Sequence, residues 1–307
     1  MAFPIQAILC AIDFSPCCSL VCEYGMALAR RTGARLYLLH AVHDPQDSLH
    51  PSAMFERGGD LTQTMADARQ RMTRLMAHAA LDWEAMVRFG DPVEQTLAVV
   101  DALPPCLVVS CSHGVSGLRR LLIGTVIERL SRTLDCPMLV VKPFSGDGGR
   151  PEAGFRCVVV SCDGSGHWHR IAPLLGLLQP DPTRPVHLVH APEGPLDIPA
   201  DTPTVSYAQA QQALQERLTR QFSRQAHRFF PERSNLSTWI SPGDPEALVL
   251  KVVREQRADL IVVGVRPSGL VGRFISGSTT EALLRHGPCA VLTVPEAKAA
   301  PAPAGGE

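Results

Sequence analysis

The stretch Ile8-Leu-Cys-Ala-Ile-Asp13 decides the fold, because its pattern returns as Val158-Val-Val-Ser-Cys-Asp163 after 163 − 13 = 150 residues. Both stretches are short apolar runs, which is typical of a buried parallel strand, and each run ends on an aspartate. Two further pairs of matches follow in the same order: residues 38–41 with 188–191, and Gly-Asp-Pro at 90–92 with Gly-Asp-Pro at 243–245. Ordered matches over nearly whole halves indicate an internal duplication.

Each copy alternates strand patterns with helix patterns. In the first copy we expect strands at 6–12, 35–42, 84–89, 106–111 and 137–142, and helices at about 17–32, 60–80, 92–102 and 125–134. Repeated β-α-β order predicts right-handed crossovers and a parallel sheet covered by helices on both faces. The sequence therefore predicts two tandem doubly wound α/β domains. Their predicted bounds are residues 1–143 and 155–295, with a linker at 144–154 and a disordered tail at 296–307.

Composition excludes several classes of function. A net charge of −1 and a pI of about 6.8 provide no basic field to attract nucleic acid or an anionic membrane. The first residues lack the basic region of a signal peptide, and no apolar run reaches the ~18–20 residues of a membrane span. We therefore expect a cytoplasmic protein whose ten cysteines are mostly reduced and inert thiols.

Ligands of such folds bind beyond the carboxyl ends of the strands. Asp13 and Asp163 each end the first strand of a copy, where an aspartate forms a turn or caps a helix and can also face a ligand. After the fourth strand, the first copy reads Cys111-Ser-His-Gly114 and continues to Gly124-Thr125. This loop is neither a Walker A loop nor a dinucleotide fingerprint.

Both copies resemble the universal stress protein domain. Nucleotide-binding members carry G-x2-G-x9-G-[ST] at this loop, followed by a helix and a final strand that contains Cys-Pro. The matching residues are Gly114, Gly124, Thr125 and 135–141 in the first copy, and Gly264, Gly277, Ser278 and 288–292 in the second. The resemblance implies a Rossmann-like strand order 3-2-1-4-5, tandem domains that pack as a pseudo-dimer, and an adenine nucleotide such as ATP beside Ala41 and Ala191.

Each copy departs from the motif at a different glycine. Cys111 stands where the first glycine of the motif belongs, and Pro267 stands where the second one belongs. If Ser268-Gly-Leu is matched instead, that glycine is deleted and one residue is inserted near Val271. A cysteine adds one Cβ to the loop, whereas a proline removes an N–H donor and fixes φ. A donor to a charged phosphate oxygen contributes about 1.5–3 kcal/mol. We therefore expect the first copy to be the better nucleotide site, with His113 as a further candidate for its lining.

Local patterns add three smaller expectations. Thr125 with Glu128, and Ser278 with Glu281, have the spacing of capping boxes. His40 with His43, and His187 with His190, have metal-like spacing, but a strand points such side chains to opposite faces, so no metal is expected. The last strands of the two copies, 137–141 and 289–294, are apolar edges that we expect to pair with each other or across chains.

The leading functional hypothesis is a regulatory protein that binds ATP or a related adenine nucleotide and is not an enzyme. Its expected assembly is a homo-oligomer or the internal pseudo-dimer. The alternative is an interaction or scaffold protein of the same fold that binds no nucleotide, and the changes at Cys111 and Pro267 motivate it. Slow nucleotide hydrolysis is a third possibility, although the sequence presents no catalytic constellation or positioned base.

Overall fold

The computed structural model describes residues 5–42, 60–112, 124–142, 154–162, 168–192, 204–265 and 278–295. The predicted tail, 296–307, and all of the predicted linker except residue 154 lie outside these ranges. The first half contains β1 (Ala7–Ala11), α1 (Cys18–Thr32), β2 (Arg35–Val42), α2 (Leu61–Leu75), β3 (Trp83–Phe89), α3 (Pro92–Ala102), β4 (Cys106–Cys111), α4 (Thr125–Thr133) and β5 (Met138–Val141). The second half contains β6 (Val158–Ser161), α5 (Trp168–Leu178), β7 (Val186–His190), α6 (Thr204–Phe229), β8 (Leu236–Ile240), α7 (Pro245–Gln256), β9 (Leu260–Val265), α8 (Ser278–His286) and β10 (Ala290–Pro295).

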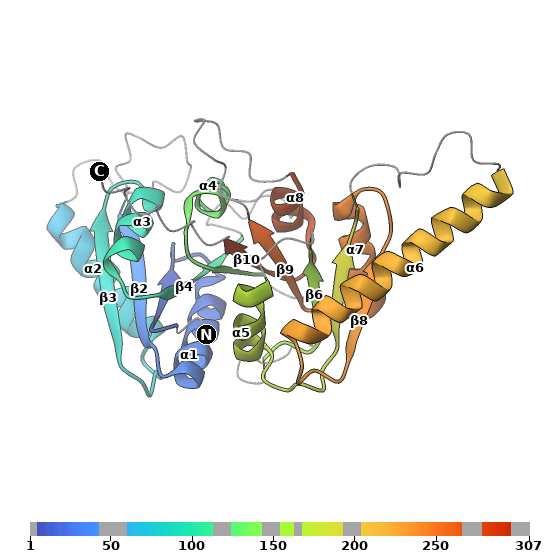
Figure 1. The fold of residues 1–307 in the computed structure, drawn as a ribbon. Helices are drawn as coiled ribbons and strands as arrows, with labels where there is room; N and C mark the ends of the chain where they lie inside the picture. The colour runs from blue at the N-terminus through green and yellow to red at the C-terminus, as the bar shows by residue number, and fades with distance from the viewer. Residues whose placement is uncertain are drawn as a thin grey trace, which may run out of the picture.

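All these strands form one sheet in the order β3-β2-β1-β4-β5-β10-β9-β6-β7-β8 (Figure 1). Within each half the neighbouring strands run parallel, and only the central pair, β5 with β10, is antiparallel. The predicted order 3-2-1-4-5 is therefore confirmed in both halves. Figure 1 shows the halves side by side, with α1 and α5 next to each other near the centre.

Alternate residues of the buried strands enter two hydrophobic cores, one on each face of the sheet. Ile8 and Cys10 of β1 contribute to the first core, together with residues of α1, α2, α5 and α6. Ala7 and Leu9 contribute to the second core, together with residues of α3, α4, α7 and α8. Period-two burial on both faces is what a doubly covered sheet requires.

The repeated Gly-Asp-Pro motif is a helix start in both halves. The glycines of 90–92 and 243–245 have φ of +125° and +126°, which a residue with a Cβ rarely adopts. Asp91 accepts hydrogen bonds from two backbone N–H groups of α3, at 2.9 and 3.0 Å, and Asp244 does the same for α7, at 3.1 and 3.3 Å. The proline that follows is the first helical residue, where its missing N–H costs nothing.

The two halves join where the sequence places its apolar edges. Val140 lies opposite Val291 and Leu139 opposite Leu292 in the antiparallel pair, so the expected pairing of the last strands is confirmed within one chain. Just beyond β5, Lys142 Nζ donates to two backbone carbonyls at the end of α8, at 2.7 and 2.6 Å. These carbonyls lack helical partners and carry the negative end of the helix dipole.

Four charged side chains of α4 and α8 form a second contact between the halves, which we call the interface quartet. Arg132 binds Glu281 across the junction, with Nε and Nη2 at 2.7 and 2.5 Å from Oε1, and also binds Glu128 of its own helix at 2.7 Å. Arg285 approaches Glu128 from the other half, at 3.9 Å. Since 281 − 128 and 285 − 132 both equal 153, the quartet consists of two copies of one pair. This arrangement is that of a pseudo-dimer.

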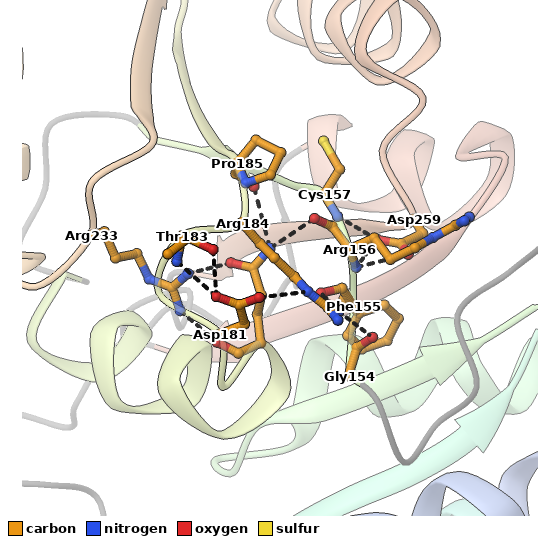
Figure 2. Close-up of polar contacts among 11 residues, drawn as sticks. Gly154, Phe155, Arg156, Cys157, Asp181, Thr183, Arg184, Pro185, Arg233 and Asp259 are labelled. Carbon is orange, nitrogen blue, oxygen red and sulfur yellow. Dashed lines mark hydrogen bonds and ion pairs between the residues drawn. The ribbon is translucent and has the colours of Figure 1, made fainter.

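A buried carboxylate anchors the start of the second half. Asp259, which directly precedes β9, accepts the backbone N–H of Arg156 at 2.9 and 3.0 Å and that of Cys157 at 3.0 Å (Figure 2). Arg184 binds the neighbouring carbonyls of Gly154 and Phe155, at 3.2 and 3.0 Å. These contacts fix the chain as it enters β6.

Candidate functional site

The candidate site lies at the carboxyl edge of the first half, where the strand order reverses. β1 is flanked by β2 on one side and by β4 on the other, so the segments that leave these strands meet at this edge. Asp13, Ala41, Cys111 and Gly124 all lie there. The structure therefore brings together those residues predicted for the first site that it describes.

Asp13 forms a turn and does not cap a helix. Its Oδ1 accepts the N–H of Ser15 at 2.9 Å and the thiol of Cys18 at 3.5 Å, and its side chain is otherwise exposed. The N-cap of α1 is Cys17, which makes no side-chain capping bond. Of the two structural roles expected for this aspartate, only turn formation is found.

Phe14 follows in a conformation that is unusual for a bulky residue, with φ of +58°. Its ring lies against the imidazole of His40 on β2, with 4.4 Å between centroids, and Arg71 of α2 lies 3.9 Å from its centroid. Such strain persists where neighbouring contacts hold it, often near functional sites. Sequence reasoning missed Phe14 and Arg71, because nothing in either residue signals a contact between segments so far apart in the chain.

His40 is tied to the main chain of the first strand. Its Nδ1 lies 3.0 Å from the carbonyl oxygen of Ile12, and burial, followed by the charge of Arg71, lowers its pKa. The second half repeats this contact, since His190 Nδ1 lies 2.8 Å from the carbonyl oxygen of Cys162. His43 lies outside the described residues. In the described part of the chain no group of three or more metal-ligating side chains occurs.

Ala41 and Cys111 flank the edge from opposite faces of the sheet. Ala41 lies two residues after Leu39 on β2, so strand alternation places both side chains on the face of the second core. Cys111 packs instead against the first core and is half buried. A ligand that crosses the strand ends can therefore meet the Cβ of Cys111 only from the side of α1.

The start of α4 differs from the predicted capping box. Gly124, with φ of −61° and ψ of 136°, is the N-cap, and Thr125 is the first helical residue. Gly124 has no side chain to cap the helix, and the carboxylate of Glu128 binds Arg132. The capping-box prediction is wrong here because the interface quartet takes the glutamate. The N-cap residue thus makes no side-chain capping bond, and the N–H groups and dipole of the first turn favour an anion.

The second half builds a different edge. Gly264 lies within β9 and pairs with Val294, and Ala191 directly follows β7. The ring of His190 stacks on Phe222 of α6, with centroids 5.3 Å apart, and Phe222 also contacts the buried Trp168. An aromatic cluster therefore covers the histidine whose counterpart in the first half contacts Phe14.

Several predicted site residues cannot be placed. The predicted positions outside the described residues are His113, Gly114, Asp163, Pro267 and Gly277. Helix α8 begins at Ser278, and Glu281 of its first turn binds Arg132. As in α4, this glutamate is engaged by the interface quartet. Whether Ser278 caps its helix stays a prediction.

Comparison with known proteins gives one consistent result. The family described as the universal stress protein family matches residues 4–142 and 171–295. A universal stress protein from Staphylococcus epidermidis is 44% identical over 61 residues, which are 20% of this chain. The chain spans only 37% of the length of that relative.

Two solved structures cover nearly the whole chain. A universal stress protein from Archaeoglobus fulgidus superposes with a TM-score of 0.62 and 18% identity, over 94% of this chain and 98% of that one. A protein of unknown function from Pseudomonas aeruginosa PAO1 gives 0.65 and 18%, over 96% and 94%. At such identities the likeness concerns the fold alone. Among the helices that the structure describes, none has the length and hydropathy needed to cross a membrane.

Proposed function

The chain belongs to the universal stress protein family, and from this membership we propose that it binds ATP or a related adenine nucleotide and acts in regulation without turnover. The first half is the stronger site. The single observation that carries the proposal is the start of α4, where the N-cap is a glycine that makes no side-chain capping bond, at the carboxyl edge of β1, β2 and β4.

The chemistry of this edge supports a phosphate-bearing ligand. The first turn of α4, whose N-cap is a glycine, offers N–H donors and the positive end of a helix dipole. Arg71 adds a positive charge near Phe14. Among the described residues between β4 and Thr125, none is basic. The ligand's affinity then depends on backbone donors, which is why the departures from the glycine motif matter.

The unequal halves support the preference for the first site. There, Cys111 adds a Cβ but keeps every N–H, whereas Pro267 in the second half removes one donor. The loss of one donor to a charged oxygen, about 1.5–3 kcal/mol, corresponds to a tenfold to hundredfold weaker site. The aromatic cover on His190 is a further difference at the same edge.

The direct experiment has two parts. Mass spectrometry of small molecules released from the denatured purified protein should detect an adenine nucleotide, and calorimetric titration of ATP should show saturable binding near one equivalent per chain. No released nucleotide, together with no heat of binding at millimolar ATP, would contradict the proposal. Phosphate release above the buffer rate would contradict the absence of turnover.

A second candidate function is an interaction or scaffold protein without a nucleotide. The residues Cys111 and Pro267 favour it, because each copy lacks one glycine of the motif. The same titration separates the two functions. If the protein is a scaffold without a nucleotide, the carboxyl edge would only support the loops that form a surface for binding a partner.

A further inference from the structure

Two thiols lie side by side at the opposite, amino-terminal edge of the first half. β4 and β5 run parallel with Val108 opposite Met138, so two residues earlier Cys106 falls beside Cys136. Both side chains enter the second core, and the two residues are 2% and 8% exposed. The two thiols are close enough for each to shift the pKa of the other. Two cysteines on neighbouring strands and on one face are within reach of a single bond.

This contact sets Cys106 apart from the other buried cysteines. The neighbouring thiol of Cys136 lowers the pKa of Cys106, and the thiol of Cys106, together with burial, raises that of Cys136. Burial instead raises the pKa of five other thiols. These five are Cys10, Cys18, Cys22, Cys157 and Cys289. Cys106 is therefore the most readily ionised of these seven thiols. Since the thiolate is the reactive form, it is also the one expected to react first.

A buried guanidinium accompanies the pair. Arg170 of α5 is close enough to Cys136 and Asp135 for their charges to raise its pKa, although burial lowers that pKa overall. It also donates to the carbonyl oxygen of Pro295, at 2.5 Å. A cation supplied by the second half therefore lies near Cys136 in the first half.

The second half shows what the same positions do without a thiol pair. With the offset of 153, Cys136 corresponds to Cys289, but Cys106 corresponds to Asp259. Figure 2 shows the Asp259 carboxylate on the backbone N–H groups at the start of β6. In the first half the equivalent N–H groups, of Gln6 and Ala7, bind the carbonyl oxygen of Pro105 at 2.8 and 3.3 Å. These N–H groups therefore have an acceptor without the side chain of Cys106.

We propose that Cys106 and Cys136 are a redox modification site, which a peroxide converts into a disulfide between the start of β4 and the segment that leads into β5. The Cys106 thiolate attacks the peroxide oxygen and becomes a sulfenic acid, while hydroxide leaves and takes up the thiol proton to form water. The thiol of Cys136 then attacks the sulfenic sulfur, forming the S–S bond and releasing a second water. Two thiols are oxidised by two electrons and one hydrogen peroxide is reduced, so the step balances.

The bond would act on the junction between the halves. It ties β4 to β5, and β5 pairs with β10 across the junction and leads into Lys142. A covalent loop between residues 106 and 136 constrains the unfolded chain. The oxidised protein is therefore more resistant to heat than the reduced protein.

The experiment uses the full-length, fully reduced protein. It is treated under native conditions with equimolar hydrogen peroxide, its remaining thiols are alkylated, and its peptides are mapped by mass spectrometry. We expect a peptide pair linked through Cys106 and Cys136, a melting temperature higher by ~5 °C, and reversal of both by dithiothreitol. Cys136→Ser should abolish the link, whereas Cys289→Ser, the matched change in the second half, should leave it intact.

Alkylated Cys106 and Cys136 in the peroxide-treated wild-type protein would overturn the proposal, because the pair would then have remained reduced. A link between other cysteines, such as Cys18 and Cys22 on successive turns of α1, would overturn it equally. The peptide map of the wild-type protein decides the question, so the test remains valid even if a serine variant fails to fold.

Discussion

At the scale of single residues, Cys111 is the change that separates the first half from the family motif. Cysteine adds a Cβ at the end of β4 that a glycine would not have. We predict that Cys111→Gly binds ATP more tightly than the wild type, by about three- to tenfold, at a cost of about 1 kcal/mol in the free energy of unfolding. Calorimetric titration measures the first effect and urea unfolding the second.

A matched variant shows which atom is responsible. Cys111→Ala keeps the Cβ and removes only the sulfur, so its affinity should stay close to that of the wild type. Equal gains in both variants would mean that the sulfur, and not the Cβ, crowds the ligand. No gain in either would mean that this side of the sheet does not meet the nucleotide.

Asp259 stabilises the second half at the amino ends of its strands. It is 6% exposed and accepts N–H groups from Arg156 and Cys157. Asp259→Ala leaves these donors without their acceptor, and we predict a loss of about 2–4 kcal/mol in the free energy of unfolding. Urea unfolding measures it. Asp101→Ala, at an exposed position of α3, is the control and should leave the midpoint unchanged.

At the scale of elements, the strands and their order follow from the sequence. Short runs that are apolar on both faces favour buried parallel strands, and β-α-β connections permit few orders. β2 and β4 have the predicted bounds, while α2 ends at Leu75 and is shorter than predicted. Met76, whose φ of −99° and ψ of 11° depart from helical values, is its C-cap and is 3% exposed.

The candidate site was predictable only in part. The glycine spacing locates Gly124 at the start of α4, but a local pattern does not reveal that Glu128 serves Arg132 and the other half of the molecule. Likewise, Phe14 and Arg71 meet only in the folded chain, where α2 packs against β2 and β3 and Phe14 packs against the same core as α2. Local sequence specifies caps and turns, and tertiary contacts decide which of the competing partners wins.

The end of β5 carries a prediction about pH. Burial lowers the pKa of Lys142 to about 8, against 10.5 in an unfolded chain. Between these pH values the unfolded state holds the proton and the folded state does not, so the free energy of unfolding should rise with pH. The slope from this group is at most about 1.4 kcal/mol per pH unit.

The measurement is a difference between two proteins. Urea unfolding of the wild type and of Lys142→Met, from pH 7 to 10, should give a stability difference that shifts towards the wild type as the pH rises. Other groups titrate in both proteins and cancel. Lys251→Met, at an exposed position of α7, should show no such trend. A constant difference for Lys142→Met would mean that its ammonium stays charged against the carbonyls of α8.

At the scale of the whole molecule, the duplication makes the protein its own partner. β5 and β10, which would be exposed edges in separate domains, cover each other, and the interface quartet uses the same residue pair from both halves. The halves then differ at both ends of their strands, the amino ends and the carboxyl ends. The first has a thiol pair where the second has Asp259, and the second has an aromatic cover where the first has Phe14 and Arg71.

The central claim is that this molecule has one effective nucleotide site, at the start of α4. Thr125→Glu and Ser278→Glu put the same negative charge on the first helical residue of α4 and α8, where it suits the helix dipole but repels a phosphate. Calorimetric titration of ATP should show binding at least tenfold weaker for Thr125→Glu and unchanged for Ser278→Glu. Unchanged binding in Thr125→Glu, or an equal loss in both variants, would contradict the claim.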